Sequence, residues 1–261
     1  MDLRAFGAGP ANRSTDVAAQ SNCFTCKAFV HTEFEALPER AVAIINEVKV
    51  TRTFRTGEPI FRAGDSSDGV HCVGAGLVCT RKRDTTGTSI PLRLRYPGDT
   101  LGFRSFLSGT DHETTAEALE PSRTCFIGGD TIRDLLSRNL DLCLSFLRRL
   151  ASDLDGAEER LLQRRTLSAR ARLAQLLLVL FGSHGTVTAN GGVQLKLPFT
   201  RRDMAAAIGV NVKSMSRIIR SFQDESIARF SGRTVQVPDF EKLVAELGPH
   251  AGVTHPSEVT G

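Results

Sequence analysis

Hydrophobic and polar residues alternate in short runs through the first half of the chain. From about residue 48 to residue 127 these runs are separated by turns that contain glycine and aspartate. Many short strands at close spacing are typical of an antiparallel barrel or jelly roll. The strand candidates are Ile60–Phe61, Val70–Val73, Leu77–Thr80, Ile90–Tyr96 and Thr124–Ile127. No helical period of useful length is expected before about residue 130, so the segment predicts a β-roll.

A different pattern follows, and it predicts one long helix over residues 136–165. Apolar residues recur at steps of seven, three, four, three and four, which is the spacing of a heptad seam. The seam consists of Leu140, Leu147, Leu150, Leu154, Ala157 and Leu161. Such a seam can join two copies of the chain in a coiled coil, or it can pack on the chain's own β-roll.

Residues 199–222 predict a helix, a tight turn and a second helix. Thr200 is a good N-cap, with Asp203 three residues later near the positive end of the helix dipole. Gly209 supplies the positive φ that a sharp turn needs. The residues expected to face the core are Met215, Ile218, Ile219 and Phe222. The residues left pointing outward are Lys213, Ser214, Ser216, Arg217 and Arg220.

This helix-turn-helix layout is typical of a protein that reads double-stranded DNA. Residues 196–233 hold eight Lys or Arg and three acidic residues, an excess of five over a whole-chain net charge of +4. That concentration of charge argues against an ordinary helical hairpin with a solvated basic face. The expected DNA contacts are Thr200, Arg201, Lys213, Ser214, Ser216, Arg217 and Arg220. Because such proteins usually pair to read two half-sites of a palindrome, we favour the homodimer for the leucine seam.

The patterns together predict an α+β chain in five parts. These are a disordered tail (1–22), a β-roll sensor domain (23–135), a dimerisation helix (136–165), a winged helix-turn-helix domain (166–247) and a second disordered tail (248–261). Within the DNA-binding domain we expect a helix over Leu167–Phe181, a loop over Gly182–Gly192, strands over Val193–Pro198 and Arg233–Val237, and a short helix over Phe240–Leu247.

Composition narrows the function classes. The 261 residues suffice for two modest domains, and no apolar run approaches the roughly 20 residues of a membrane span. The first residues lack an apolar signal core, so we expect a cytoplasmic protein whose six cysteines stay reduced unless they bind metal or sense oxidants. The six histidines show no metal-ligand spacing such as His-Glu-x-x-His, and an enzyme is not expected.

Several local patterns, in their order and spacing, resemble the CRP/FNR superfamily of transcriptional regulators, closest to its FNR/FixK-like branch. They are Gly57–Asp65, Pro97–Phe103, Ala118–Cys125 and the helix segment Met215–Arg217. The resemblance covers about residues 23–247. It implies a cyclic-nucleotide-binding-like β-roll, a homodimer on palindromic DNA, and RNA polymerase as a partner.

The resemblance does not imply cAMP or haem as the ligand. Members that bind cyclic nucleotides carry an Arg-Ser pair for the phosphate, and Thr114–Ala116 stands at the matching place. Threonine lacks the charged fork of arginine, so cAMP is not expected. Carbon-monoxide-sensing haem members place a Cys and a His around Gly102–Ser105, where this chain has neither, so that haem site is not supported.

The iron–sulfur members are a better match. They use an N-terminal cysteine cluster and one distant cysteine, to which Cys23, Cys26 and Cys125 correspond. Soft thiolates suit a [4Fe–4S] cluster. This chain has two N-terminal cysteines where the family usually has three. The missing ligand could be His31, Asp16, Cys72 or another carboxylate.

Other roles for the cysteines stay open. The Cys-x-x-Cys pair could form a thiol redox switch, or the cysteines could have no sensing role, as in a FixK-like regulator without a cluster. Cys72, Cys79 and Cys143 are also readily explained as small core residues.

If a cluster binds, we expect it to order the N-terminal segment against the β-roll and to favour the dimer. Oxygen would destroy the cluster and return the monomer, which switches DNA binding off. The relatives commonly place Glu where Lys213 stands, and Lys cannot accept from cytosine. The half-site should therefore keep the guanine read by Arg217 and differ at the neighbouring base pair.

Overall fold

The computed structural model describes residues 22–188 and 192–248. The two expected tails, apart from Asn22 and Gly248, and the candidate ligand Asp16 lie outside the described residues. The described residues fall into two compact units, one with residues 22–79 and 94–146 and one with residues 80–93, 147–188 and 192–248. The expected division into 23–135, 136–165 and 166–247 stays a prediction. No helix in the described part of the chain is long and apolar enough to cross a membrane.

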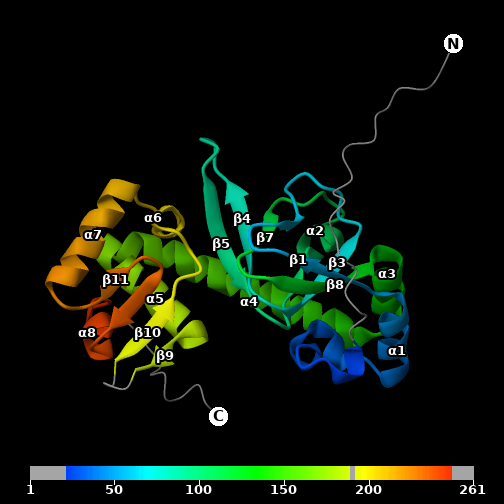
Figure 1. The fold of residues 1–261 in the computed structure, drawn as a ribbon. Coiled ribbons are helices and arrows are strands. Elements are labelled where there is room, and N and C mark those ends of the chain that lie inside the picture. Colours follow the sequence, from blue (N-terminus) through cyan, green and yellow to red (C-terminus); the bar gives the residue numbers. More distant parts are fainter. Residues whose placement is uncertain (1–21, 189–191, 249–261) are drawn as a thin grey trace. The chain divides into compact units, whose positions relative to one another are not determined.

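The first unit opens with three short 3-10 helices and contains most of the β-roll (Figure 1). The helices are η1 (Cys23–Thr25), η2 (Phe29–His31), η3 (Glu33–Ala36), α1 (Glu39–Val48), α2 (Phe103–Ser108) and α3 (Gly129–Arg138). The strands are β1 (Val50–Phe54), β2 (Pro59–Phe61), β3 (Gly69–Ala75), β6 (Thr100–Leu101), β7 (Thr115–Ala118) and β8 (Ser122–Gly128). The hairpin of β4 (Val78–Arg83) and β5 (Ser89–Arg95) spans the boundary between the units.

Two antiparallel sheets build the β-roll, with strand orders β1-β8-β3-β6 and β2-β7-β4-β5. The expected strands are all present, and β1, β6 and β7 are additions. In the first sheet Cys125 of β8 lies opposite Thr51 of β1 on one side and Cys72 of β3 on the other. Because directly opposed residues share a face of the sheet, these three side chains form one row.

The interior of the β-roll is apolar. Its buried cluster consists of Phe54, Ile60, Phe61, Val73, Val78, Leu101, Ala116 and Ala118. Burying each of the larger side chains contributes roughly 1.5–3 kcal/mol. Within the segment expected to lack helices, α2 is a short exception. Its six residues lie between Gly102 and Gly109, which both have positive φ (80° and 68°) and bound the helix on each side.

The long helix is α4, which spans Leu140–Thr166 and is 27 residues long. The prediction that it starts at residue 136 was wrong, because residues 136–138 belong to α3. Asn139 separates the two helices with an extended backbone (φ −133°, ψ 97°), and its side-chain amide donates to the carbonyl of Leu135 at 2.7 Å. This contact satisfies one of the last carbonyls of α3.

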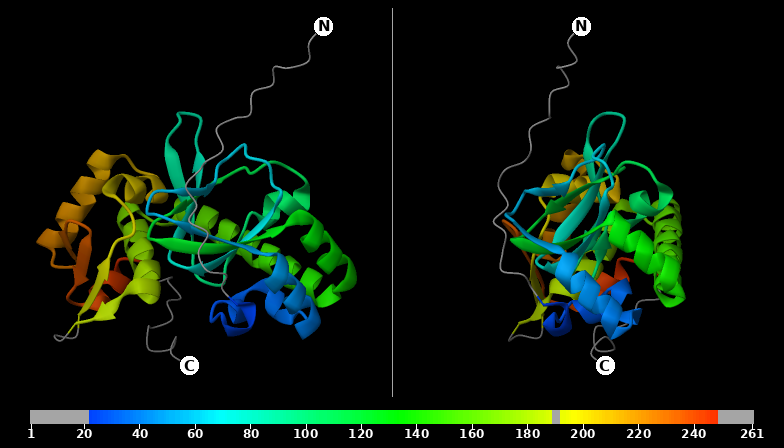
Figure 2. Two further views of the ribbon diagram at one scale, coloured as in Figure 1. Left: turned by 45° about the vertical axis from the view of Figure 1, so that its right-hand side comes forward. Right: turned by 90° about the vertical axis from the view of Figure 1, so that its right-hand side faces the viewer.

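The second unit holds the winged helix-turn-helix. Its elements are α5 (Ala169–His184), β9 (Thr186–Val187), β10 (Val193–Lys196), α6 (Arg201–Ile208), α7 (Val212–Asp224), β11 (Arg229–Ser231), β12 (Thr234–Val237) and α8 (Phe240–Ala245). The sheet order is β11-β12-β10-β9, and Figure 2 shows this sheet beside its helices. The loop expected over Gly182–Gly192 is shorter than predicted, since α5 continues to His184 and β9 pairs with β10.

Candidate DNA interface and cysteine site

The helix-turn-helix forms as the sequence predicts. The Thr200 hydroxyl accepts from the backbone amide of Asp203 at 3.1 Å, and the Asp203 carboxylate accepts from the amide of Thr200 at 3.0 Å. This capping box starts α6, and Gly209 ends it with φ 70°. The Thr200 hydroxyl also donates to Asp203 at 2.7 Å, so its proton is already used. Thr200 therefore acts as the cap, and its contact with DNA stays a prediction.

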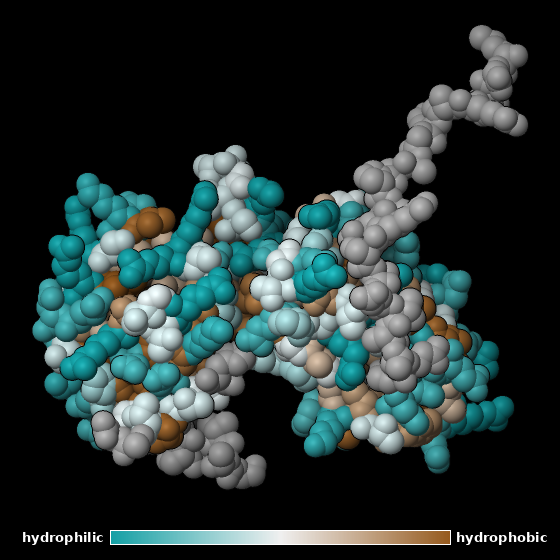
Figure 3. All heavy atoms as spheres, in the orientation of Figure 1, coloured by the Kyte–Doolittle hydropathy of each residue, from teal (hydrophilic) through white to brown (hydrophobic). Residues whose placement is uncertain are grey.

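The second helix, α7, has one buried and one exposed face. Asn211 caps it by accepting from the amide of Ser214 at 2.8 Å. Met215, Ile219 and Phe222 are buried as expected, while Ile218 is only half-buried. Lys213, Ser216, Arg217 and Arg220 are exposed and Ser214 is half-buried, and Arg201 on α6 is exposed too. Figure 3 shows mainly hydrophilic side chains over α6 and α7 on the face that it draws.

An arginine that the sequence analysis missed anchors the end of α7. Arg170 of α5 donates to both carboxylate oxygens of Glu225 at 2.7 Å and to both oxygens of Glu246 at 2.9 and 2.7 Å. Its guanidinium also lies 5.1 Å from the centre of the Phe222 ring. The hydrogen bonds from Arg170 and Ser221 lower the pKa of Glu225 to about 2. Arg170 thus fixes α7 against α5 and α8.

A second missed arginine fixes the turn. Arg172 donates through Nε to the carbonyl of Ile208 at 2.8 Å and through Nη1 to the carbonyl of Leu167 at 2.7 Å. Ile208 is the last residue of α6, and Leu167 directly follows α4. One side chain therefore connects the end of the long helix to the turn that precedes α7.

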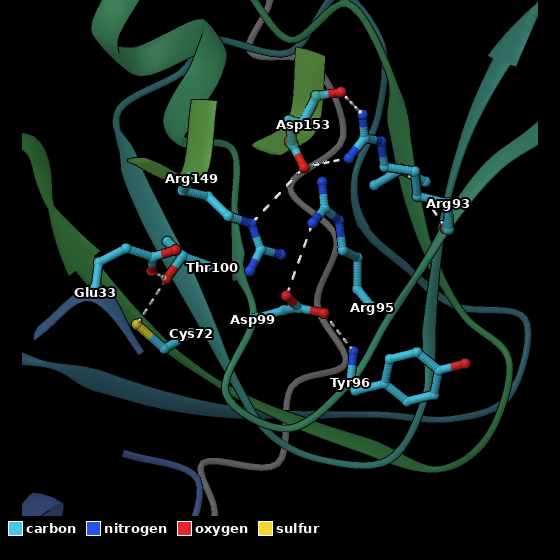
Figure 4. A network of polar contacts seen from close by, with 10 residues as sticks. Glu33, Cys72, Arg93, Arg95, Tyr96, Asp99, Thr100, Arg149 and Asp153 are labelled. Carbon is cyan, nitrogen blue, oxygen red and sulfur yellow. Dashed lines mark hydrogen bonds and ion pairs between the residues drawn. The ribbon is translucent and has the colours of Figure 1, made fainter. Parts of the chain in front are cut away.

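A third arginine reaches the cap of α6. Arg81 of β4, which groups with the second unit, donates from Nη1 to Asp203 at 2.6 Å. Burial alone would raise the pKa of Asp203, but the hydrogen bonds from Arg81 and Thr200 outweigh it and lower that pKa. The same unit also holds Asp153 of α4, which pairs with Arg93 and lies 3.8 Å from Arg149 (Figure 4).

The leucine seam of α4 is open in the single chain. Leu140, Leu147, Leu154 and Leu161 are 73%, 58%, 59% and 64% exposed, and Leu150 is half-buried. Leu142 and Phe146 of the same helix are buried, so α4 keeps a packed face and an uncovered apolar face.

The three predicted cysteine ligands meet at one small cavity of about 30 Å³ in the first unit. Cys23 and Cys26 come from the N-terminal 3-10 segment and Cys125 comes from β8. Its other lining residues are Ala28, Phe29, Thr32, Phe34, Ile45, Lys49, Cys72, Gly74 and Ile127. His31 is exposed and does not line the cavity. Within residues 22–188 and 192–248, no three donor side chains already stand at metal-binding spacing.

A buried cation accompanies these thiols. Lys49 is 2% exposed, and its ammonium group donates to the side-chain oxygen and to the backbone carbonyl of Asn46, beside the Cys23 thiol. Asn46 also accepts from the backbone amide of Cys23 at 2.9 Å. Burial raises the pKa of Cys23, and Lys49 opposes that effect.

The sheet side of the cavity carries two cysteines rather than one. The Cys125 sulfur lies 3.8 Å from the Thr51 hydroxyl, and the Cys72 sulfur lies 4.0 Å from the Thr100 hydroxyl. Thr100 donates in turn to the buried carboxylate of Glu33 (Figure 4). Burial raises the pKa of Cys72 well above its usual value, so the thiol is neutral in this arrangement.

The places considered for other ligands have structural roles. The Thr115 hydroxyl accepts from the amide of Ala63 at 3.1 Å, and Ala116 is fully buried in the apolar cluster. Gly102 precedes α2, which begins at Phe103.

Two family models match separate parts of the chain. Residues 51–139 match the model of a cyclic nucleotide-binding domain, and residues 171–246 match that of a Crp-like helix-turn-helix domain. The fumarate and nitrate reduction regulatory protein of Yersinia pestis is 25% identical over 206 residues, which cover 78% of this chain and 80% of that protein. The anaerobic regulatory protein of Haemophilus influenzae is 24% identical over 203 residues, 78% of each.

Solved structures share the fold. FixK2 from Bradyrhizobium japonicum is 22% identical with a TM-score of 0.66, and the match covers 78% of this chain and all of that one. The c-di-GMP-responsive regulator CLP from Xanthomonas campestris is 17% identical with a TM-score of 0.68, over 77% of this chain and all of that one.

Proposed function

Because the chain belongs to the CRP/FNR superfamily of transcriptional regulators, we propose that it acts as a homodimer that responds to oxygen or redox state through a cysteine-ligated iron–sulfur cluster. The superfamily consists of DNA-binding regulators rather than enzymes. The proposal therefore starts from DNA binding and adds the dimer, the cluster and the signal. The observation that carries the proposal is the convergence of Cys23, Cys26 and Cys125 on one cavity. A cytoplasmic location and an interaction with RNA polymerase belong to the same proposal.

DNA reading rests on the exposed face of α7. Arg217 can donate two hydrogen bonds to a guanine, and Ser214 and Ser216 can contact phosphates. Lys213, Arg201 and Arg220 add positive charge along the same helix pair, which attracts the DNA backbone irrespective of sequence.

Dimerisation rests on the open seam of α4. Leu140, Leu147, Leu154 and Leu161 are more than half exposed, at the spacing that two parallel helices bury between them. A second copy of the chain presents the same seam, so the contact is self-complementary. The pairing sets the distance between the two copies of α7 and therefore the half-site spacing.

The residues of the cavity suit an iron–sulfur cluster by their chemistry. Thiolates bind iron and sulfide, and a buried ammonium group offsets negative charge. A cavity of about 30 Å³ holds one or two water molecules, so a four-iron cluster requires residues 22–36 to move away from the sheet. When bound, such a cluster supplies oxygen-labile redox chemistry. The protein's part is to provide the thiolates, exclude water and couple the segment to α4.

A regulator without a cluster is the second candidate. The small volume of the cavity and the raised pKa of the Cys23 thiol suit a FixK-like regulator that acts without a ligand. A thiol switch would instead join Cys23 and Cys26, and it needs an oxidant.

An anaerobic absorption spectrum with iron and sulfide analysis tests the proposal. The expected result is a brown protein with about four irons per chain that bleaches in air and then loses affinity for DNA. A colourless, iron-free chain that still binds DNA would reject the cluster. Loss of DNA binding on mild oxidation of that iron-free chain, reversed by a thiol reductant, would identify the thiol switch.

A further inference from the structure

We propose that Cys72 is the fourth thiolate of the iron–sulfur site, in place of the third N-terminal cysteine that this chain lacks. This inference rests on the proposed function. Cys72 lines the same cavity as Cys23, Cys26 and Cys125, so four thiols surround it in the described structure. Two come from the N-terminal segment and two from the sheet, which places donors on opposite walls.

The register of the sheet fixes the two sheet cysteines. Cys72 of β3 and Cys125 of β8 are directly opposed in an antiparallel pair. Side chains at such positions share one face, with Cβ atoms about 4.5–5.5 Å apart. The neighbouring residues of the same two strands, His71 and Phe126, are paired on the other face, where their rings lie 4.8 Å apart. A thiol at position 72 therefore points with Cys125 toward the N-terminal segment.

The other candidates for the fourth ligand are less well placed. His31 is exposed and packs near Gly98 instead of entering the cavity. Glu33 is buried, but its carboxylate accepts the hydrogen bond of Thr100. Cys143 does not line the cavity, and its sulfur lies 3.2 Å from the carbonyl oxygen of Leu136, to which it donates.

The charge at the cavity supports four thiolates. The Lys49 ammonium is buried, and among the residues that the structure describes no carboxylate forms an ion pair with it. A buried cation is costly unless an anion or hydrogen-bond acceptors compensate it. Lys49 donates to two neutral oxygens of Asn46, the side-chain carbonyl and the backbone carbonyl, and its charge acts on the neighbouring Cys23 thiol. Four thiolates around an iron–sulfur core carry net negative charge, which supplies the missing counter-charge. Each thiol releases its proton to solvent as its sulfur binds iron.

The test compares two full-length variants, Cys72→Ser and Cys143→Ser, after anaerobic reconstitution with ferrous iron and sulfide. Iron and sulfide per chain and the visible spectrum are measured. We expect Cys143→Ser to match the parent chain in iron content and spectrum. For Cys72→Ser we expect the iron content to fall by roughly threefold or more, or the visible spectrum to change, because an oxygen donor is a poorer ligand for the cluster. Cys72→Ala is a second substitution at the same position and a third variant in the test, since alanine cannot bind iron at all. Melting of the iron-free chains checks that the variants fold.

The outcomes separate this inference from the proposed function. A parent chain that takes up no iron rejects both. A parent chain with about four irons, together with Cys72→Ser and Cys72→Ala variants that keep the same iron and the same spectrum, rejects only Cys72 as the ligand. Repeating the measurement with His31→Ala then asks whether the histidine completes the site instead.

Discussion

The ring of Phe34 meets the ring of Phe146 edge-on, with centroids 5.7 Å apart and planes at 84°. Phe34 lies in η3 and also lines the cysteine cavity, whereas Phe146 lies in α4 immediately before Leu147 of the seam. Both rings are almost fully buried. One side chain therefore contacts both the proposed sensor site and the proposed dimer helix, so we expect a movement of residues 22–36 to reach α4 through this contact.

Replacing Phe34 by alanine should destabilise the first unit and uncouple the cavity from α4. Removal of a buried phenylalanine costs about 3–5 kcal/mol, which urea denaturation of the iron-free chain measures. Phe24→Ala is the matched control, because Phe24 is 51% exposed in the same segment and its loss should stay within about 0.5 kcal/mol. The milder Phe34→Leu should keep iron binding but reduce the difference in dimer affinity with and without iron. An unchanged difference would show that the coupling takes another route.

Arg217→Ala should weaken binding to the preferred operator by about 1–3 kcal/mol and relax the sequence preference at one base pair. Arg201→Ala should weaken binding evenly across sequences, because a phosphate contact carries no base information. Fluorescence anisotropy with the operator and its single-base variants, at fixed salt, distinguishes the two patterns. Binding-site selection checks Lys213 separately. Recovery of the standard half-site of the family would contradict the role assigned to that lysine.

Local signals in the sequence were sufficient for the DNA-binding unit. Thr200, Gly209 and the apolar spacing of α7 act within a few residues, so the cap, the turn and the buried face could be predicted. Ile218 was placed in the core because it stands at the edge of the apolar stripe, where a small rotation of the helix decides exposure. The break at Asn139 was missed because the heptad pattern of α4 begins only one residue later.

Contacts between distant residues could not be predicted in the same way. Arg81 and Asp203 are 122 positions apart, and Arg170 and Glu246 are 76 apart, so only the folded chain reveals these pairs. The cysteine site is intermediate. Its three predicted ligands, Cys23, Cys26 and Cys125, follow from the cysteine pattern of the family. Cys72 joins them only because of the register between β3 and β8, since a shift of one residue would turn its side chain to the other face of the sheet.

Leu161→Ala should weaken the dimer, whereas Leu162→Ala should not. The two leucines are adjacent on α4 and similarly exposed, at 64% and 56%, but only Leu161 lies on the heptad seam. Loss of a leucine from a paired seam should cost about 2 kcal/mol or more in each copy, or about 4 kcal/mol per dimer, so the dissociation constant should rise at least several hundredfold, roughly 700-fold. Sedimentation velocity over a dilution series measures it. Equal effects of the two variants would place the dimer contact on another face.

Acid should break the ion pair between Arg170 and Glu225. The hydrogen bonds from Arg170 hold the pKa of Glu225 at about 2, below its ordinary value of 4.5. A group whose pKa is lowered by folding stabilises the folded state fully above its ordinary pKa, and that contribution is lost as the pH falls toward the folded value. The part of the stability that depends on Glu225 should therefore decline between about pH 4.5 and pH 2. Thermal melts of the parent chain and of Glu225→Gln should differ at neutral pH and converge over this interval.

Glu241→Gln, a change at an exposed position of α8, is the control and should follow the parent at every pH. Melting curves that coincide at neutral pH for the parent and Glu225→Gln would show that the Glu225 carboxylate does not anchor α7.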